Sequence, residues 1–307
     1  MKTTSDAYEL LCVLQWPKIG PATALDLLRR KKAEDSVLEA AEQRFPGVDA
    51  AQRQVARDRA EQIIERCSDL GLAVLGYDDA SFPVRLRTIP DVPAIIYVRG
   101  DPGVLHYPSL AVVGTRQVSS AGARAAELIA RFLARRSFNV VSGLALGVDM
   151  HAHVGALEAN GITTAVLAHG LDRVAPSSHR ALAERIVDSG GALVSEHPPG
   201  VPPRPAEFVR RNRLQSGLSL GSVVVESGVT GGSMHQARFT CDQKRRLFTV
   251  LAESDETRGD LNEAGARHLI DTLGAVPLRG TRDLARELTM LEVPLPQSEP
   301  PQVHMEW

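Results

Sequence analysis

The sequence has few cysteines and lacks long apolar runs. Its three cysteines among 307 residues, Cys12, Cys67 and Cys241, are too widely spaced for a zinc knuckle or a disulfide framework. No apolar run approaches the roughly 18 residues that cross a bilayer, and no basic segment followed by an apolar core opens the chain. We therefore expect a cytoplasmic protein with free thiols and no membrane association.

Two common nucleotide-binding motifs are also absent. The chain has no Gly-x-Gly-x-x-Gly, which counts against a dinucleotide dehydrogenase, and no Gly-x-x-x-x-Gly-Lys-Ser/Thr, which counts against a P-loop ATPase. His151 and His153 would lie about 200° apart around a helix, so they cannot share a metal ion. We expect neither a cofactor nor a metal.

Charge and aromatic content limit the ways of binding nucleic acid. The net charge is −2, so affinity for nucleic acid requires a local basic patch. Aromatic residues make up only 4% of the chain, which leaves little base stacking and predicts low sequence preference.

The N-terminal third is expected to contain a helical domain and a connecting segment. Residues 1–70 read as helices: one capped by Ser5 and running to Leu14, a second that begins at Pro21, and a long polar helix over 50–70. The turn over 16–21 resembles that of a helix-hairpin-helix, in which Lys18 would contact a DNA phosphate; a plain turn in a small helical domain is an equally open interpretation.

Between residues 71 and 107, two strand-like runs are separated by prolines, and we expect this stretch to connect two domains. At the other end of the chain, over 281–307, a weak helix leads into a proline-rich segment that is expected to be disordered.

Residues 108–280 alternate between apolar strands and helices, which is typical of a parallel sheet covered on both faces. The expected strands are 110–114, 138–142, 162–167, 191–194, 221–226 and 246–251, and the expected helices are 119–136, 149–160, 177–188, 207–216, 232–244 and 262–273. Right-handed crossovers make a Rossmann-like doubly wound, mostly parallel sheet the economical α/β topology. The predicted fold is this sheet with a small helical N-terminal domain.

Three turns of small residues follow predicted strands and precede predicted helices. They are Gly114-Thr115-Arg116, the Ser142-Gly143 turn that extends to Gly147, and Gly231-Gly232-Ser233. Backbone N–H groups and helix N-termini at such turns bind phosphate, and turns of this kind lie at the carboxyl edge of a parallel sheet. Asp149 is expected to cap the helix after the second turn.

The segment over 198–213 combines a proline-stiffened loop with a short basic helix. Four arginines against Glu207 give residues 204–213 a local charge of +3. Arg210, Arg211, Asn212 and Arg213 therefore point to an anionic partner. Glu226 ends a buried strand, and Arg211 or Arg213 is its expected partner.

Motifs along residues 8–275 resemble, in order, those of the DprA/Smf family, the DNA-processing proteins of bacterial transformation. They are Phe82-Pro83-Val84-Arg85-Leu86, Tyr97-Val98-Arg99-Gly100, Val113-Gly114-Thr115-Arg116, Ser142-Gly143-Leu144-Ala145, Gly147-Val148-Asp149, Ala152-His153, Gly170-Leu171-Asp172, Ser195-Glu196, Pro198-Pro199-Gly200, Pro203, Phe208, Arg211-Asn212-Arg213 and Gly217-Leu218-Ser219. The proline-to-Arg-Asn-Arg segment is the most specific.

The resemblance implies a non-enzymatic homodimer that binds single-stranded DNA without cutting it and loads a RecA-type recombinase during DNA uptake. The DNA phosphates would contact Gly114, Thr115, Arg116, Ser142, Gly143, Gly147, Arg210, Arg211, Asn212, Arg213, Gly231, Gly232 and Ser233.

The chain departs from the family pattern at several positions. Leu146 stands where the family usually has a lysine or arginine, and His179 where it usually has an asparagine. A late Gly-Thr-Asn motif is degenerate at 257–259, and the C-terminal winged-helix domain of many members is not found in this sequence. The loss of one phosphate-binding cation predicts weaker DNA binding.

Two other functions remain open from the sequence. One is a nucleotide-binding sensor in a defence or stress system. The other is a phosphoribohydrolase of the LOG type in the same superfamily, although the glycine-rich signature of those enzymes is absent because Glu226 precedes its glycines instead of following them.

Overall fold

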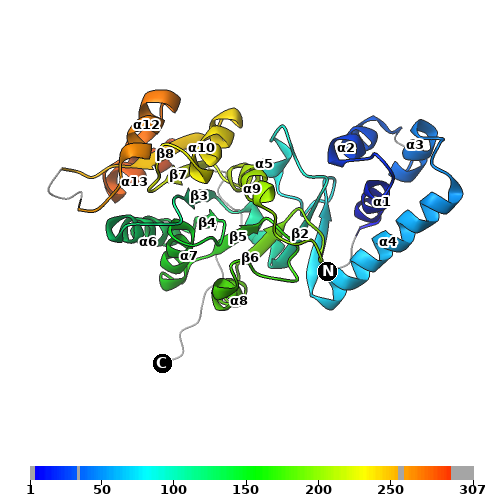
Figure 1. The fold of residues 1–307 in the computed structure, drawn as a ribbon, viewed down its shortest axis with the longest axis horizontal. Coiled ribbons are helices and arrows are strands. Elements are labelled where there is room, and N and C mark those ends of the chain that lie inside the picture. Colours follow the sequence, from blue (N-terminus) through cyan, green and yellow to red (C-terminus); the bar gives the residue numbers. More distant parts are fainter. Residues whose placement is uncertain (1–3, 33–34, 255–258, 292–307) are drawn as a thin grey trace.

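A computed structural model describes residues 4–32, 35–254 and 259–291 and confirms the α/β class (Figure 1). The strands are β1 (Leu72–Gly76), β2 (Ile95–Gly100), β3 (Ser109–Val113), β4 (Asn139–Ser142), β5 (Thr163–Leu167), β6 (Ala192–Ser195), β7 (Gly221–Val224), β8 (Arg246–Val250) and β9 (Val276–Leu278). The helices are α1 (Ser5–Leu14), α2 (Pro21–Arg30), α3 (Val37–Arg44), α4 (Ala50–Asp69), α5 (Val84–Arg87), α6 (Ser120–Ala134), α7 (Val148–Glu158), α8 (Arg180–Asp188), α9 (Pro205–Leu218), α10 (Gly232–Asp242), α12 (Ala264–Leu273) and α13 (Thr281–Thr289), with short 3₁₀ turns η1 (Pro102–His106) and η2 (Ser177–His179). The proline-rich segment after α13 lies outside the described residues.

The described strands form one sheet in the order β1-β2-β6-β5-β4-β3-β7-β8-β9. From β6 to β9 neighbouring strands run parallel, and the sequence order reverses between β3 and β7. In open α/β sheets, ligands bind outside the carboxyl ends of the strands at this reversal. The loops after β3 and β7 meet there.

Residues 71–107 extend the sheet, in contrast to the expectation of a connecting segment. β1 pairs antiparallel with β2, and β2 pairs antiparallel with β6 along the edge of the parallel strands. The prolines between the two strands suggested a linker, but both strand-like runs expected there form strands, and they are buried except at the Arg99-Gly100 end of β2. β9, at the opposite edge, has only three residues and was not predicted.

Two helical layers cover the sheet. In Figure 1, α9, α10 and α12 lie above the strands and α6, α7 and α8 below them. The apolar cores agree with this division, because Met234 of α10 and Leu269 of α12 pack with one side of β3 and β7, whereas Ala126 of α6 and Ala152 of α7 pack with the other. Helix α9 therefore lies beside α10, over the switch point.

The N-terminal helices begin where local capping predicts. Thr4, and not Ser5, caps α1, with its hydroxyl accepting the Ala7 N–H, and Pro21 occupies the first turn of α2. Capping boxes begin α3 at Ser36 and α4 at Asp49. One apolar core runs from these helices into β1 and β2, so the helical region packs directly on the edge of the sheet.

His153 is a buried imidazole whose effect on the pH dependence of stability can be tested by substitution. This ring is fully buried on α7, its Nδ1 is 2.7 Å from the Thr163 Oγ1, and burial, with His179 and Arg211 nearby, lowers its pKa to about 3. The unfolded chain binds a proton near pH 6.5 that the folded chain does not, so this group reduces stability as pH falls from about 6.5 towards 3. The cost is about 2 kcal/mol at pH 5.

We expect the free energy of unfolding, measured by urea denaturation, to decrease less between pH 7 and pH 5 in His153→Gln than in the unaltered chain. His151→Gln, on the same helix but partly exposed, serves as the control. An unchanged pH dependence in His153→Gln would show that the buried ring does not titrate in this way.

Candidate nucleic-acid interface

A groove of about 440 Å³ lies at the switch point between β3 and β7. Its walls come from the loop after β3, the start of α7, helix α9, and the loop between β7 and α10 with the first turns of α10. The lining includes Gly114, Thr115, Arg116, Phe208, Arg211, Asn212, Gln215, Ser227, Gly231, Gly232, Ser233 and Gln236. The first and third predicted turns therefore line the same groove.

The first turn brings a cation to the groove. A Cβ at Gly114 would lie 2.5 Å from Val148 Cγ2 and 2.7 Å from the Glu226 carbonyl oxygen, so only glycine allows the backbone to pass here. Arg116 follows, is exposed, and places its guanidinium 5.3 Å from the ring centroid of Phe208. Among the described residues, Arg116 has no carboxylate within ion-pair distance.

The third turn presents an open helix N-terminus. Gly231 has φ of +115°, and neither Gly231 nor Gly232 has a neighbouring atom within 4 Å of a Cβ position. No side chain caps α10, whose first residue is Gly232. Asn212 holds the turn from α9, donating from Nδ2 to the Gly232 carbonyl at 3.1 Å. Unpaired N–H groups at such an N-terminus favour a bound anion.

The second turn, by contrast, is filled by the protein's own carboxylate. Oδ2 of Asp149 accepts hydrogen bonds from the backbone N–H groups of Gly143, at 3.1 Å, and Ala145, at 3.4 Å. Asp149 lies in the first turn of α7, whose N-cap is Gly147, so the prediction that Asp149 is the cap was wrong. Ser142 is also buried, and its hydroxyl donates to the Val112 carbonyl.

Gly147 lies under the first turn and is also buried. It has φ of +77°, and a Cβ there would lie 2.3 Å from the Thr115 carbonyl oxygen. Its role in the structure is to bring α7 against the loop after β3. Ser142, Gly143 and Gly147 therefore support the groove from beneath and do not line it.

Arg211 lines the groove, but it is a buried residue rather than an exposed cation. Its Nη1 donates to the Gly143 carbonyl oxygen at 3.0 Å and also to that of Val166. Burial lowers the pKa of its guanidinium to about 10, and Asp149 opposes this shift. Burial likewise raises the pKa of Asp149, and Arg211 opposes that shift. The two opposite charges thus compensate each other inside the protein.

The other two arginines of α9 lie away from the groove lining. Arg213 is buried and ion-paired to Asp91 at 2.8 Å and to Glu196 at 2.6 Å, which corrects the expectation that it faces an anionic partner. Arg210 is exposed, with its Nε 4.0 Å from Glu196. Of the α9 cations, only Arg210 remains accessible.

Among the described residues, Glu226 pairs with no arginine. Its Oε2 accepts hydrogen bonds from the backbone N–H and hydroxyl of Ser119, and its Oε1 accepts one from the backbone N–H of Asn262. Ser119 is the N-cap of α6, so the buried carboxylate lies at a helix N-terminus, where its charge is stabilised. The predicted partners, Arg211 and Arg213, were wrong.

Two buried amides in the groove were missed from the sequence. Nε2 of Gln215 and Oε1 of Gln236 are buried without a hydrogen-bond partner among the described residues, and both side chains line the groove. The only feature of the sequence that could have identified them is a polar side chain on a helix face that is otherwise expected to be buried. An unpaired donor and acceptor in one groove suit a polar ligand.

Three residues singled out from the sequence lie outside the groove lining. Lys18 is exposed in the turn before α2 with φ of +63°. Leu146 is 49% exposed and follows Ala145, which lines the groove. His179 is buried, and its Nδ1 is 2.8 Å from the Leu144 carbonyl oxygen, beneath the second turn.

A doubly wound sheet with a groove of this kind defines a Rossmann-like ligand-binding protein. Within that class, residues 73–289 match the family model of DNA recombination-mediator protein A, and the chain belongs to this family. It is 43% identical over 173 residues to Protein Smf of Escherichia coli, covering 56% of this chain and 46% of that protein. It is 34% identical over 233 residues to Protein Smf of Synechocystis, covering 71% and 58%. The chain thus spans about half the length of these curated relatives.

Solved structures agree with the family. The X-ray structure of DNA processing protein A from Streptococcus pneumoniae superposes with a TM-score of 0.75 at 26% identity, covering 93% of this chain and 99% of that one. DNA processing protein A from Helicobacter pylori, whose structure concerns its single-stranded DNA binding mode, superposes with a TM-score of 0.62 at 25% identity, covering 71% and 96%.

Two glycines predicted to contact phosphate should respond oppositely to alanine. A Cβ at Gly143 would lie 2.4 Å from Nη1 of Arg211 and 2.5 Å from Oδ2 of Asp149, so Gly143→Ala should cost about 1–3 kcal/mol of stability. Gly232 has open space, so Gly232→Ala should leave stability unchanged or raise it slightly. Urea denaturation of both variants measures the difference, and equal stabilities would contradict a structural role for Gly143.

Proposed function

We propose that this chain binds single-stranded DNA through the switch-point groove, as a non-enzymatic mediator that assists a RecA-type recombinase during DNA uptake. The observation that carries the proposal is that the open N-terminus of α10 and the exposed Arg116 line the same groove. The helix end offers backbone N–H groups and the arginine offers a forked cation. Both bind phosphate oxygens without reading base identity.

The rest of the groove supports binding of a strand with little sequence preference. Phe208 is the single aromatic residue among the residues that line it, so base stacking contributes at one position. Arg210, exposed on α9, extends the cationic surface beyond the lining. The chain's net charge of −2 makes this local concentration of cations necessary for binding.

Support for the partners comes from the family. DNA processing protein A of Helicobacter pylori has a single-stranded DNA binding mode, and this chain superposes on that protein over 71% of its length. The recombinase and the homodimer follow from the family resemblance. The three cysteines are free, in agreement with a cytoplasmic location. In the described part of the chain, no helix is both long and apolar enough to span a membrane.

The contacts of Glu226 disfavour the phosphoribohydrolase alternative. Such an enzyme needs an accessible carboxylate near the sugar, whereas both oxygens of Glu226 accept hydrogen bonds within the protein. Glu226 is also 4% exposed and absent from the groove lining.

A small nucleotide is the second candidate ligand, because Nε2 of Gln215 and Oε1 of Gln236 are an unpaired donor and acceptor suited to a base edge in the groove. A thermal-shift comparison of nucleoside monophosphates with oligo-dT separates the two candidates. Stronger stabilisation by oligo-dT supports the proposal, and stronger stabilisation by a mononucleotide favours a sensor.

Replacing Arg116 tests the groove. Arg116→Ala should weaken oligo-dT binding several-fold and reduce the slope of log K against log salt by about one, because one phosphate contact is lost. Fluorescence anisotropy at several salt concentrations measures both quantities. Arg180→Ala, an exposed change on α8 on the opposite face of the sheet, should leave binding unchanged. Equal effects of the two substitutions would place the strand elsewhere.

Adding a cation at Leu146 should have the reverse effect. Leu146 is exposed beside the groove at a position where related proteins usually have a lysine or arginine. Leu146→Lys should tighten oligo-dT binding and raise the salt slope by about one. Leu146→Gln, which adds no charge, is the matched control, and equal binding by the two variants would contradict a strand path past this residue.

A further inference from the structure

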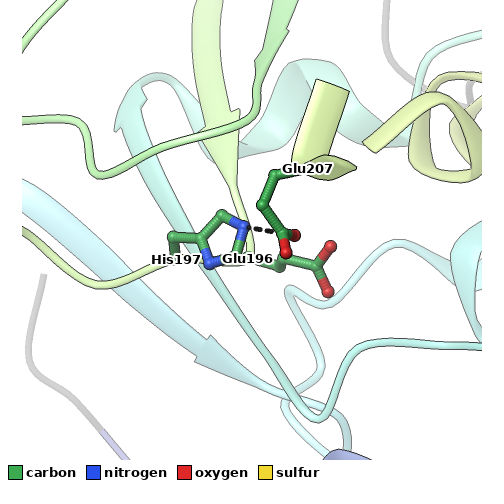
Figure 2. Close-up of side chains that lie close together, drawn as sticks. All are labelled: Glu196, His197 and Glu207. Carbon is green, nitrogen blue, oxygen red and sulfur yellow. Dashed lines mark hydrogen bonds and ion pairs between the residues drawn. The ribbon is translucent and has the colours of Figure 1, made fainter. Parts of the chain in front are cut away.

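Outside the groove, three side chains with metal-binding atoms come together where the loop after β6 meets the first turn of α9. They are Glu196, His197 and Glu207, and their ligand atoms lie within 4.8 Å of one another (Figure 2). Nε2 of His197 is 3.1 Å from Oε2 of Glu207. None of the three lines the groove, so this cluster is separate from the proposed DNA site.

Glu196 has an unsatisfied oxygen at this cluster. Its side chain is only 8% exposed, and its Oε2 accepts a hydrogen bond from Arg213 at 2.6 Å. Its Oε1 is buried and accepts no hydrogen bond from the described residues; Nε of Arg210 lies 4.0 Å from it, beyond hydrogen-bond distance. A buried carboxylate oxygen without a donor is costly, so this atom requires a further partner.

The local charge favours a cation. Three carboxylates, those of Asp91, Glu196 and Glu207, face two guanidinium groups, those of Arg210 and Arg213. Glu196 is ion-paired with Arg213, whereas Glu207 is paired with no guanidinium among the described residues. The five groups together carry a net charge of −1, three negative against two positive, which a bound cation would offset.

The backbone holds the three residues in place. The Ser195 hydroxyl donates to the His169 carbonyl and accepts the His197 N–H, which fixes the end of β6 where the loop begins. Pro198 and Pro199 then restrict the loop, and Pro205 begins α9 two residues before Glu207. Because both sides of the cluster are restrained, little conformational entropy is lost when an ion binds.

We propose that Glu196, His197 and Glu207 bind one divalent transition-metal ion of the zinc type. Zinc takes imidazole nitrogen and carboxylate oxygen at about 2.0–2.2 Å, which places neighbouring ligand atoms about 3.3 Å apart, close to the spacing of the His197–Glu207 pair. The histidine selects against magnesium and calcium, which prefer oxygen ligands. Three protein ligands leave a fourth position for water.

Such an ion would cross-link the loop after β6 to the first turn of α9, because each of the two segments supplies ligands. The next residue after Glu207 is Phe208, which lines the groove, and Arg211 follows one turn later. The ion would therefore stabilise the wall of the groove without touching the DNA. Metal binding itself does not depend on the proposed function, so the test measures the metal directly.

The experiment titrates the purified full chain with Zn²⁺ by isothermal calorimetry and with Co²⁺ by visible absorption. One ion per chain is expected, together with a Co²⁺ absorption band of a low-coordinate site. His197→Phe and the milder Glu207→Gln should each weaken binding about tenfold or more.

A second histidine–glutamate pair in the chain provides the matched control. Nδ1 of His151 is 2.7 Å from Oε1 of Glu127, and both side chains are about as buried as those of His197 and Glu207. Among the described residues, this pair has no third metal-binding side chain close to it. His151→Phe should leave Zn²⁺ and Co²⁺ binding unchanged, and so should Cys241→Ser, which removes a partly exposed thiol. The proposal is wrong if calorimetry and absorption detect no bound ion, or if both His197→Phe and Glu207→Gln bind as the unaltered chain does.

Discussion

The groove depends on two opposite charges buried in its lining, Asp149 and Arg211. The carboxylate binds the backbone of the turn after β4, and the guanidinium binds carbonyl oxygens after β4 and at the end of β5. Since Asp149 belongs to α7 and Arg211 to α9, helices on opposite faces of the sheet meet at this point. Removal of either charge would leave the other buried and uncompensated, which is strongly destabilising.

This arrangement divides the three glycine turns of the chain into two physical kinds. The turn at Gly143 is closed by the chain's own carboxylate and provides rigidity. The turns at Gly114 and Gly231 border the groove, and the second of them leaves a helix N-terminus open. In both kinds of turn, backbone N–H groups attract an anion. At Gly143 the anion is the protein's own Asp149 carboxylate, whereas at Gly231 the N–H groups remain open to a ligand.

The sequence predicted the sheet well because its strands are apolar and regularly spaced. The six strands and six helices expected over residues 108–280 all appear, most with shifts of one to three residues at their ends. The antiparallel pairing of β1 and β2 could not be predicted from the sequence, because pairing across such a distance in the chain leaves no local pattern.

The site was predicted less well. Gly114, Arg116 and the Gly231 turn reach the groove, but Arg211 and Arg213 are buried, since charge alone does not show whether the chain supplies its own partner.

The continuous apolar core between the N-terminal helices and the sheet has a consequence for how this architecture is inherited. Residues such as Leu10 and Ala60 of the helices belong to the same core as Val74 and Ile96 of the sheet edge. We therefore expect the two regions to unfold cooperatively. An exchange of the helical region for another domain during evolution would have to preserve the shape of this shared surface, because an unmatched domain would leave the apolar edge of the sheet exposed to solvent.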